Sequence, residues 1–223
     1  MKNLWIIANW KSNKNIQEAL AWLEIVGPKI AKKENVKVVV CPTFTDIEEV
    51  KKTILVGNYP ILVGAQDLSP FEDGPHTGEE SARILSDLVD LAILGHSERR
   101  QNFNETDEMV AEKSARAKEY HITPLVCVQN DKTPVPENVK LVAFEPVFAI
   151  GTGQADSPED ANQVAAELKG RYGNDLEILY GGSTTSANAK SFLEQSNLNG
   201  LLIGQSSLDG EEFVKIVEVA YRV

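Results

Sequence analysis

Charged side chains stand directly after three apolar runs of the sequence. Lys11 follows the first run, His96 and Glu98 follow the fourth, and Glu145 follows the sixth. A carboxylate can remove a proton from carbon, and an imidazole can exchange protons with substrate oxygens. An ammonium group stabilises negative charge that develops on oxygen. These residue types together indicate acid–base chemistry through a negatively charged intermediate.

Glycine-rich turns follow the last three apolar runs. AIGTG comes shortly after Glu145, YGGST contains Ser183, and GQSS contains Gly204 and Gln205. Backbone N–H groups in turns that lead into helices can bind a phosphate group. Glycine by itself often only permits a tight bend, so these turns indicate an anion site only together with the charged residues.

Eight short aliphatic runs alternate with helical patterns, which predicts parallel β-strands covered by helices. Thr106 is the expected N-cap of one helix, and Ser157 followed by Pro158 begins another. The predicted strands begin at Trp5, Val36, Ile61, Leu91, Thr123, Lys140, Glu177 and Gly200.

Eight strands in this rhythm, without a linker or low-complexity tract, predict a single (β/α)8 barrel domain over residues 1–223. A doubly wound parallel sheet is the alternative fold, but no G-x-G-x-x-G follows the first strand. In a barrel, the segments after the strands gather at one face, where such folds carry their chemistry. The barrel would therefore bring Lys11, His96 and Glu145 into one pocket.

The overall charge limits the possible partners. The 223 residues carry a formal net charge of -11, and no basic face is evident. Nucleic acid and anionic membrane surfaces both require such a face, so we expect neither as a partner. A small anionic ligand remains possible in a locally positive pocket.

Cysteine usage and hydropathy indicate a soluble cytoplasmic protein. Cys41 and Cys127 lie inside apolar runs, where buried free thiols are expected, as suits a reducing compartment. Asn9 interrupts the first apolar stretch too early for a signal peptide. No later run approaches the ~20 residues that a membrane span needs.

Four motifs give the chain a resemblance to a known family. They are NWK at residues 9–11, GHSERR at 95–100, EPVFAIGTG at 145–153 and YGGS at 180–183. In type, order and spacing they resemble the triosephosphate isomerases, nearly from end to end. The resemblance implies interconversion of dihydroxyacetone phosphate and D-glyceraldehyde 3-phosphate without cofactor or metal, with Glu145 as the base and His96 as the electrophile.

The resemblance also implies the roles of further residues. Asn9 and Lys11 would bind the substrate, with Glu98 in support, and the phosphate would meet the backbones of Gly151, Ser183, Gly204 and Gln205. A lid would close over the phosphate and exclude water. Its residues would be Pro146, Val147, Phe148, Ala149, Ile150, Gly151, Thr152 and Gly153, the first three forming a stiff hinge.

Several positions depart from the family pattern. Phe148 stands where the family usually has Trp, Gln205 replaces a second Gly, and Asp67 replaces Asn. Gln154, Ala155 and Asp156 replace the usual Lys-Thr-Ala after the lid. We expect these changes to affect lid kinetics and the fit around the phosphate, and not the type of reaction.

The segment GAQDLSPFEDGPHTGEE, from Gly64, resembles the family's third loop, which reaches into a neighbouring subunit. Thr77 would then lie close to Asn9 and Lys11 of that neighbour. More than a dozen residues without a helix or strand usually have a function. We therefore expect a homo-oligomer, most simply a homodimer.

A tetramer stays open because of residues 129–139, which are shorter than the family's segment. Pro134 and Pro136 exclude a regular helix there. The outer faces of the fifth and sixth strands would lack a full helical cover, and neighbouring helices or another chain would have to bury them.

Two other functions are alternatives. An epimerase or aldolase on the same barrel would need a second acid or a Schiff-base lysine in the barrel, and neither is evident. A silent phosphate-binding protein would keep the glycine turns but would have no need of Lys11, His96 and Glu145.

Overall fold

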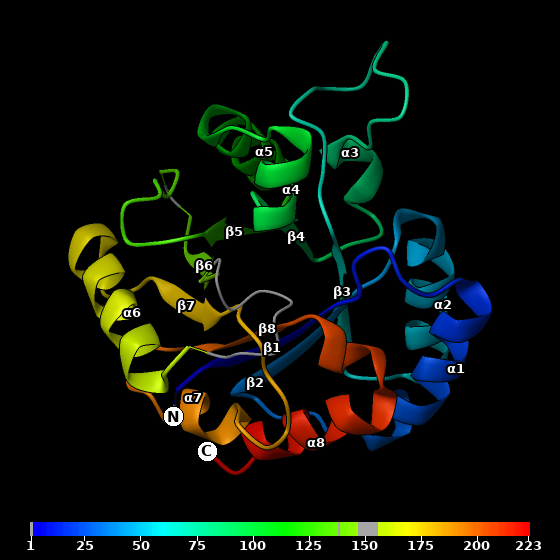
Figure 1. Cartoon of the computed structure of the whole chain (residues 1–223). Helices are drawn as coiled ribbons and strands as arrows, with labels where there is room; N and C mark the ends of the chain where they lie inside the picture. Colours follow the sequence, from blue (N-terminus) through cyan, green and yellow to red (C-terminus); the bar gives the residue numbers. More distant parts are fainter. Residues whose placement is uncertain (1, 138, 147–155) are drawn as a thin grey trace.

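The protein is a closed barrel of parallel β-strands surrounded by helices (Figure 1). This computed structural model describes residues 2–137, 139–146 and 156–223. Each strand pairs with the next along the chain, and β1 pairs with β8 to close the barrel. The strands are β1 (Leu4–Asn9), β2 (Val36–Cys41), β3 (Ile61–Ala65), β4 (Leu91–Leu94), β5 (Thr123–Val128), β6 (Leu141–Phe144), β7 (Glu177–Tyr180) and β8 (Gly200–Ile203). The predicted barrel is confirmed, and the doubly wound sheet is wrong because an open sheet would leave two unpaired edges.

The helices of the described residues lie outside the barrel and run back between successive strands (Figure 1). They are α1 (Ile16–Val26), α2 (Ile47–Gly57), α3 (Ala82–Leu85), α4 (Ser97–Phe103), α5 (Asp107–Glu119), α6 (Pro158–Tyr172), α7 (Ala189–Leu193) and α8 (Gly210–Ala220). None of them combines the length and apolar character needed to cross a bilayer.

Side-chain caps start several of these helices. Asn15 caps α1, Thr106 accepts a hydrogen bond from the N–H of Met109 in α5, and Ser157 caps α6. Caps satisfy N–H groups that have no partner inside the helix, and each typically stabilises a helix by about 1 kcal/mol. The predicted starts of α5 and α6 are confirmed.

The apolar core has two layers, one inside the barrel and one between the barrel and the helices. Successive side chains of a strand belong to different layers because they point to opposite faces. Leu125 of β5, for example, belongs to the inner layer and Val126 to the outer layer. Burial on both faces explains why the strands read as continuous aliphatic runs.

The connection between β5 and β6 contains no helix in its described residues, as Pro134 and Pro136 predicted. Val135 and Val139 of this connection are buried and belong to the outer core layer. The backbone N–H of Val135 also donates a hydrogen bond to the hydroxyl of Tyr172 at the end of α6.

The outer faces of β5 and β6 have no covering helix from the described residues of their connection, as expected, but they need no second chain to bury them. Val126 and Val142 of their outer faces are fully buried within this one chain. Valines of the short connection contribute to the same layer, so an extended segment provides part of the cover that a helix would otherwise give.

The long connection between β3 and α3 projects away from the barrel (Figure 1). The ring of Phe71 stacks on the ring of His76 with the ring centroids 4.3 Å apart, and Asp73 pairs with Arg83 of α3. Thr77 lies in the same connection and is exposed. Contacts within the segment therefore shape a loop that stands out from its own barrel.

Candidate active site

A cavity of about 770 Å³ opens at the carboxyl ends of the strands. The described segments that line it follow β1, β4, β6, β7 and β8, as the barrel predicted. The predicted site residues that it brings together are Asn9, Lys11, His96, Glu98, Glu145, Ser183, Gly204 and Gln205. Gly151 and the rest of the expected lid from residue 147 onward lie outside the described residues.

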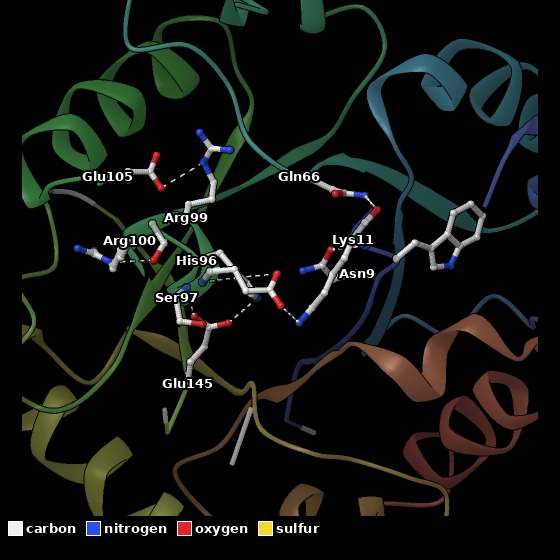
Figure 2. Close-up of polar contacts among 12 residues, drawn as sticks. Asn9, Lys11, Gln66, His96, Ser97, Arg99, Arg100, Glu105 and Glu145 are labelled. Atoms are coloured by element: carbon white, nitrogen blue, oxygen red, sulfur yellow. Dashed lines mark hydrogen bonds and ion pairs between the residues drawn. The ribbon is translucent and has the colours of Figure 1, made fainter. Parts of the chain in front are cut away.

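Glu145 is the first residue after β6, and it is fully buried. Its Oε2 accepts a 2.8 Å hydrogen bond from the backbone N–H of Ser97 at the start of α4 (Figure 2). Its Oε1 lies 2.8 Å from Nε2 of His96 but makes no hydrogen bond of good geometry with any described residue. One oxygen is therefore held by a backbone amide, and the other is buried beside the imidazole without a hydrogen-bond partner among the described residues.

His96 is the N-cap residue of α4, so its ring stands at the positive end of the helix. Its Nδ1 accepts a hydrogen bond of 3.2 Å from the backbone N–H of Glu98. A ring nitrogen that accepts a hydrogen bond carries no proton, so the neutral ring has its hydrogen on Nε2. Nε2 is then the donor of the ring, and it lies 2.8 Å from Oε1 of Glu145 without hydrogen-bond geometry toward that oxygen.

Lys11 supplies a fixed cation at the end of β1. Its φ of +55° is unusual for a residue with a side chain, and two contacts hold this backbone. Its N–H donates to Oδ1 of Asn9 at 3.1 Å, and its carbonyl accepts from Nε2 of Gln66 at 2.8 Å (Figure 2). The ammonium group pairs with Glu98 at 2.6 Å. Among the described residues that line the cavity, Lys11 carries the only fixed positive charge.

The segments after β7 and β8 line another part of the cavity with uncharged groups. Ser183 lies in the turn after β7, and Gly204 precedes the short 3₁₀ helix Gln205–Leu208. A turn that leads into a helix presents N–H groups suited to an anion. Thr185 and Asn188 add further polar side chains to this wall.

The chain on both sides of residues 147–155 is well held. Pro146 is buried beside Glu145. On the far side, the N–H of Asp156 donates to the hydroxyl of Tyr180 at 2.8 Å, and the Tyr180 ring stacks on Phe192. Burial raises the pKa of Tyr180 to about 12, so this hydroxyl stays protonated at neutral pH.

Gly181 gives Glu145 the space that it occupies. A Cβ atom at Gly181 would lie 2.9 Å from Cγ of Glu145 and 3.1 Å from the carbonyl oxygen of Phe144. Contacts this short force atoms to move, and the Phe144 carbonyl is held in the sheet. Only glycine fits at this position without displacing the carboxylate.

Three residues that support the site were not predicted: Gln66, Ser97 and Gly181. Gln66 follows β3, so the rule that polar residues after strands face the site would have found it. Ser97 acts through its backbone N–H, and Gly181 acts by having no side chain. Neither contribution leaves a signal in the residue type alone.

Three buried charged side chains, Asp67, Glu105 and Lys113, form a cluster with the half-buried Arg99 at the base of the projecting loop. Lys113 pairs with Asp67 at 2.7 Å and also with Glu105, and Arg99 lies 2.8 Å from Asp67. Burial raises the pKa of Asp67 to about 6, against the attraction of Lys113. Because Arg99 belongs to α4, the cluster joins the loop to the helix that begins beside His96.

Both cysteines are free and buried, as predicted. Burial raises the pKa of each thiol, and the charge of Glu145 raises that of Cys127 further. A thiol that stays protonated is a poor nucleophile, so neither cysteine is suited to covalent catalysis. Within the described residues, no group of three His, Cys, Asp or Glu side chains is arranged to hold a metal ion.

Comparisons with known proteins agree with this site. The family model for triosephosphate isomerase matches residues 4–220. The triosephosphate isomerase of Alkaliphilus oremlandii is 37% identical, over 97% of this chain and 99% of the relative. Those of Hahella chejuensis and Leifsonia xyli are each 38% identical, and the alignments cover at least 95% of both chains. The chain therefore belongs to the triosephosphate isomerase family.

Proposed function

We propose that this enzyme interconverts dihydroxyacetone phosphate and D-glyceraldehyde 3-phosphate through an enediol(ate). The observation that carries the proposal is that one cavity is lined by Glu145, by His96, whose Nε2 lies 2.8 Å from Oε1 of that carboxylate, and by Lys11. Family membership over nearly the whole chain supports the same reaction.

Glu145 takes a proton from the carbon beside the substrate carbonyl and later returns it to the neighbouring carbon. The electron pair of the broken C–H bond forms the C=C bond of the enediolate, while the carbonyl becomes a negatively charged oxygen. His96 donates its Nε2 hydrogen to that oxygen and takes the hydrogen of the other hydroxyl. Lys11 stabilises the negative charge on oxygen throughout.

The substrate phosphate binds at the turns that contain Ser183, Gly204 and Gln205. These residues line the cavity, and their backbone N–H groups are the donors that we assign to the phosphate oxygens. Residues 146–153 are the proposed lid, and Gly151 is its phosphate contact. A closed lid would exclude water and protect the enediolate from loss of its phosphate.

The structure favours this reaction over the alternatives. An aldolase needs a lysine whose amine is free to attack a carbonyl, but the amine of Lys11 is paired with the carboxylate of Glu98 at 2.6 Å. A silent phosphate-binding protein would have no need to bury Glu145 with one oxygen directed at His96. The buried carboxylate of Glu145 beside His96 supports proton transfer and not only the binding of a phosphate.

We further propose that two copies of the chain form a homodimer through the loop at residues 66–81. Phe71 of that loop, Ile84 of α3 and Phe103 of α4 expose 49%, 48% and 65% of their surfaces. Such apolar side chains around a projecting loop are typical of a protein interface. The exposed Thr77 would then lie near Asn9 and Lys11 of the partner. The main argument for a tetramer was an uncovered outer face of β5 and β6. That argument no longer applies, because the outer faces of both strands are buried within the single chain.

The remaining proposals concern the setting of the enzyme. We infer that it works in the cytoplasm, since its two cysteines are free, and that the reaction uses neither cofactor nor metal. With a net charge of -11, no nucleic acid or anionic membrane surface is expected as a partner.

A coupled assay with purified protein tests the function. Glyceraldehyde 3-phosphate is supplied, and the dihydroxyacetone phosphate that forms is reduced by an NADH-dependent dehydrogenase. We expect steady oxidation of NADH that depends on this protein. Absence of turnover in a folded preparation would overturn the proposal.

A further inference from the structure

Arg100 lies outside the cavity lining, but it contacts the turn from which His96 projects. Its Nε donates a 2.8 Å hydrogen bond to the carbonyl oxygen of Gly95 (Figure 2). Its Nη1 pairs at 2.6 Å with Oδ1 of Asp107, the first residue of α5. The guanidinium group therefore joins the residue before His96 to the next helix.

The turn leaves no room for a side chain at Gly95. Gly95 has a φ of +69°, and a Cβ atom there would lie 2.8 Å from Nη2 of Arg100 and from Cγ2 of Val110. The guanidinium thus packs directly against the α-carbon of Gly95. The backbone N–H of Arg100 also donates to the carbonyl of His96 at 3.1 Å, so Arg100 contacts two successive peptide groups.

This turn sets the positions of both proposed acid–base groups. His96 projects from it, and the next peptide N–H, that of Ser97, holds the carboxylate of Glu145. The contact between Glu98 N–H and Nδ1 fixes the tautomer of the ring, but the place of the ring follows the backbone at residues 95–96. Gln129 is a second donor to Gly95, but at 3.5 Å its bond is weak.

We propose that Arg100 is a positioning residue: its bridge from Gly95 to Asp107 fixes the turn at residues 95–97 and so the relative placement of His96 and Glu145. This inference rests on the isomerase function proposed above. The bridge needs a planar fork whose donors point in two directions, which arginine has. Lysine offers the same charge at a single point and cannot reproduce both contacts.

The test compares Arg100→Lys with Arg116→Lys. Arg116 also pairs with carboxylates, those of Glu72 and Glu119, but it does not contact the turn. The measurements are kcat and KM in the coupled assay and the ¹⁵N NMR signals of the His96 ring. We expect Arg100→Lys to lower kcat by roughly tenfold or more with KM changed less than about threefold, because misplacing a catalytic group chiefly affects turnover.

The His96 ¹⁵N signals should also shift in Arg100→Lys. In Arg116→Lys we expect unchanged His96 signals and a kcat within about twofold of that of the parent enzyme. A folded Arg100→Lys enzyme with unchanged kcat and unchanged His96 signals would overturn the proposal. If that variant does not fold, Asp107→Ala removes the acceptor of Nη1 and keeps Arg100. Unchanged kcat and His96 signals in Asp107→Ala would then overturn the proposal, and changes in both would support it. The parent enzyme in the same assay tests the isomerase function separately.

Discussion

At the scale of single residues, the site depends on a carboxylate that is buried and yet has one oxygen without a fixed partner. Burying a charged group costs free energy unless hydrogen bonds compensate. For Glu145, the N–H of Ser97 at the start of α4 provides one such bond. The oxygen near His96 keeps its capacity to accept a proton from a substrate.

Changes at Glu145 should affect turnover far more than the fold. Gln removes the basicity, and Asp shortens the reach, so each variant lacks one requirement of proton transfer. We expect kcat to fall by about a thousandfold or more in Glu145→Gln, with similar far-ultraviolet circular dichroism. Near-normal turnover in the purified variant would show that another group is the base.

Lys11 and Gln205 should differ in their importance. Lys11→Met removes the only fixed positive charge from the described cavity lining. Gln205→Gly leaves the backbone N–H that we assign to the phosphate, so KM should change less than about tenfold, or ~1.4 kcal/mol. Steady-state kinetics of both variants decide the point. We expect the larger loss of kcat/KM in Lys11→Met. A larger loss in Gln205→Gly would show that the Gln205 side chain contributes more to the reaction than the charge of Lys11.

The sequence predicted which charged side chains line the cavity, because the position of a residue directly after a strand is set by the barrel. It did not predict Ser97 or Gly181. The amide of Ser97 is useful only because α4 points it at Glu145, and the missing side chain of Gly181 matters only because Glu145 lies against it. These contributions depend on distances between segments that are far apart in sequence.

At the scale of elements, α4 connects the site to the projecting loop. His96 caps the helix, and Arg99 within it contacts Asp67 at the base of the loop. Lys113 of α5 and Glu105 between the two helices complete this buried cluster. A change in the charge of Asp67 therefore acts on two helices and a loop together.

The charge of Asp67 should make stability depend on pH. Its pKa is about 6 in the folded protein against an ordinary value of 3.8, so the folded state binds the proton more tightly than the unfolded chain. The resulting stabilisation is complete below pH 3.8 and is lost as the pH rises through 6. From pH 8 to pH 5, the free energy of unfolding should rise by about 1 kcal/mol more in the parent protein than in Asp67→Asn. Urea unfolding at both pH values measures this difference, and a change of opposite sign would mean that ion pairing with Lys113 and Arg99 outweighs burial.

Element order was predictable because each strand is buried on both faces and each long helix has a clear start. The cover over β5 and β6 was not predicted. Pro134 and Pro136 correctly excluded a helix, but a connection without a helix can still bury side chains. Val135 and Val139 do so, and this packing cannot be read from local propensity.

At the scale of the whole molecule, an acidic protein must attract an anionic substrate. The net charge of -11 repels a phosphate at long range, so the cavity needs local attraction from Lys11 and from backbone N–H groups. Because of screening, higher ionic strength should reduce the long-range repulsion more than the short contacts in the cavity.

We expect light scattering at micromolar concentration to give the mass of a homodimer. Phe71→Asp, in the projecting loop, should shift the protein toward monomers with lower activity. Leu55→Asp is the matched control, since Leu55 is an exposed apolar residue of α2, away from this loop. A fully active monomer would contradict the role proposed for Thr77 at a partner's site.

Glu145 is proposed to carry a proton between neighbouring carbons of a triose phosphate, and isotope exchange follows that proton. Turnover of glyceraldehyde 3-phosphate in ²H₂O is followed by ¹H NMR, with Glu145→Gln as the comparison. A carboxylate exchanges its proton with solvent, so we expect deuterium at the carbon that receives the proton in part of the dihydroxyacetone phosphate formed. The Glu145→Gln enzyme should form neither the product nor the deuterated species at a comparable rate. Equal rates of isomerisation and deuterium incorporation in the two enzymes would contradict the claim.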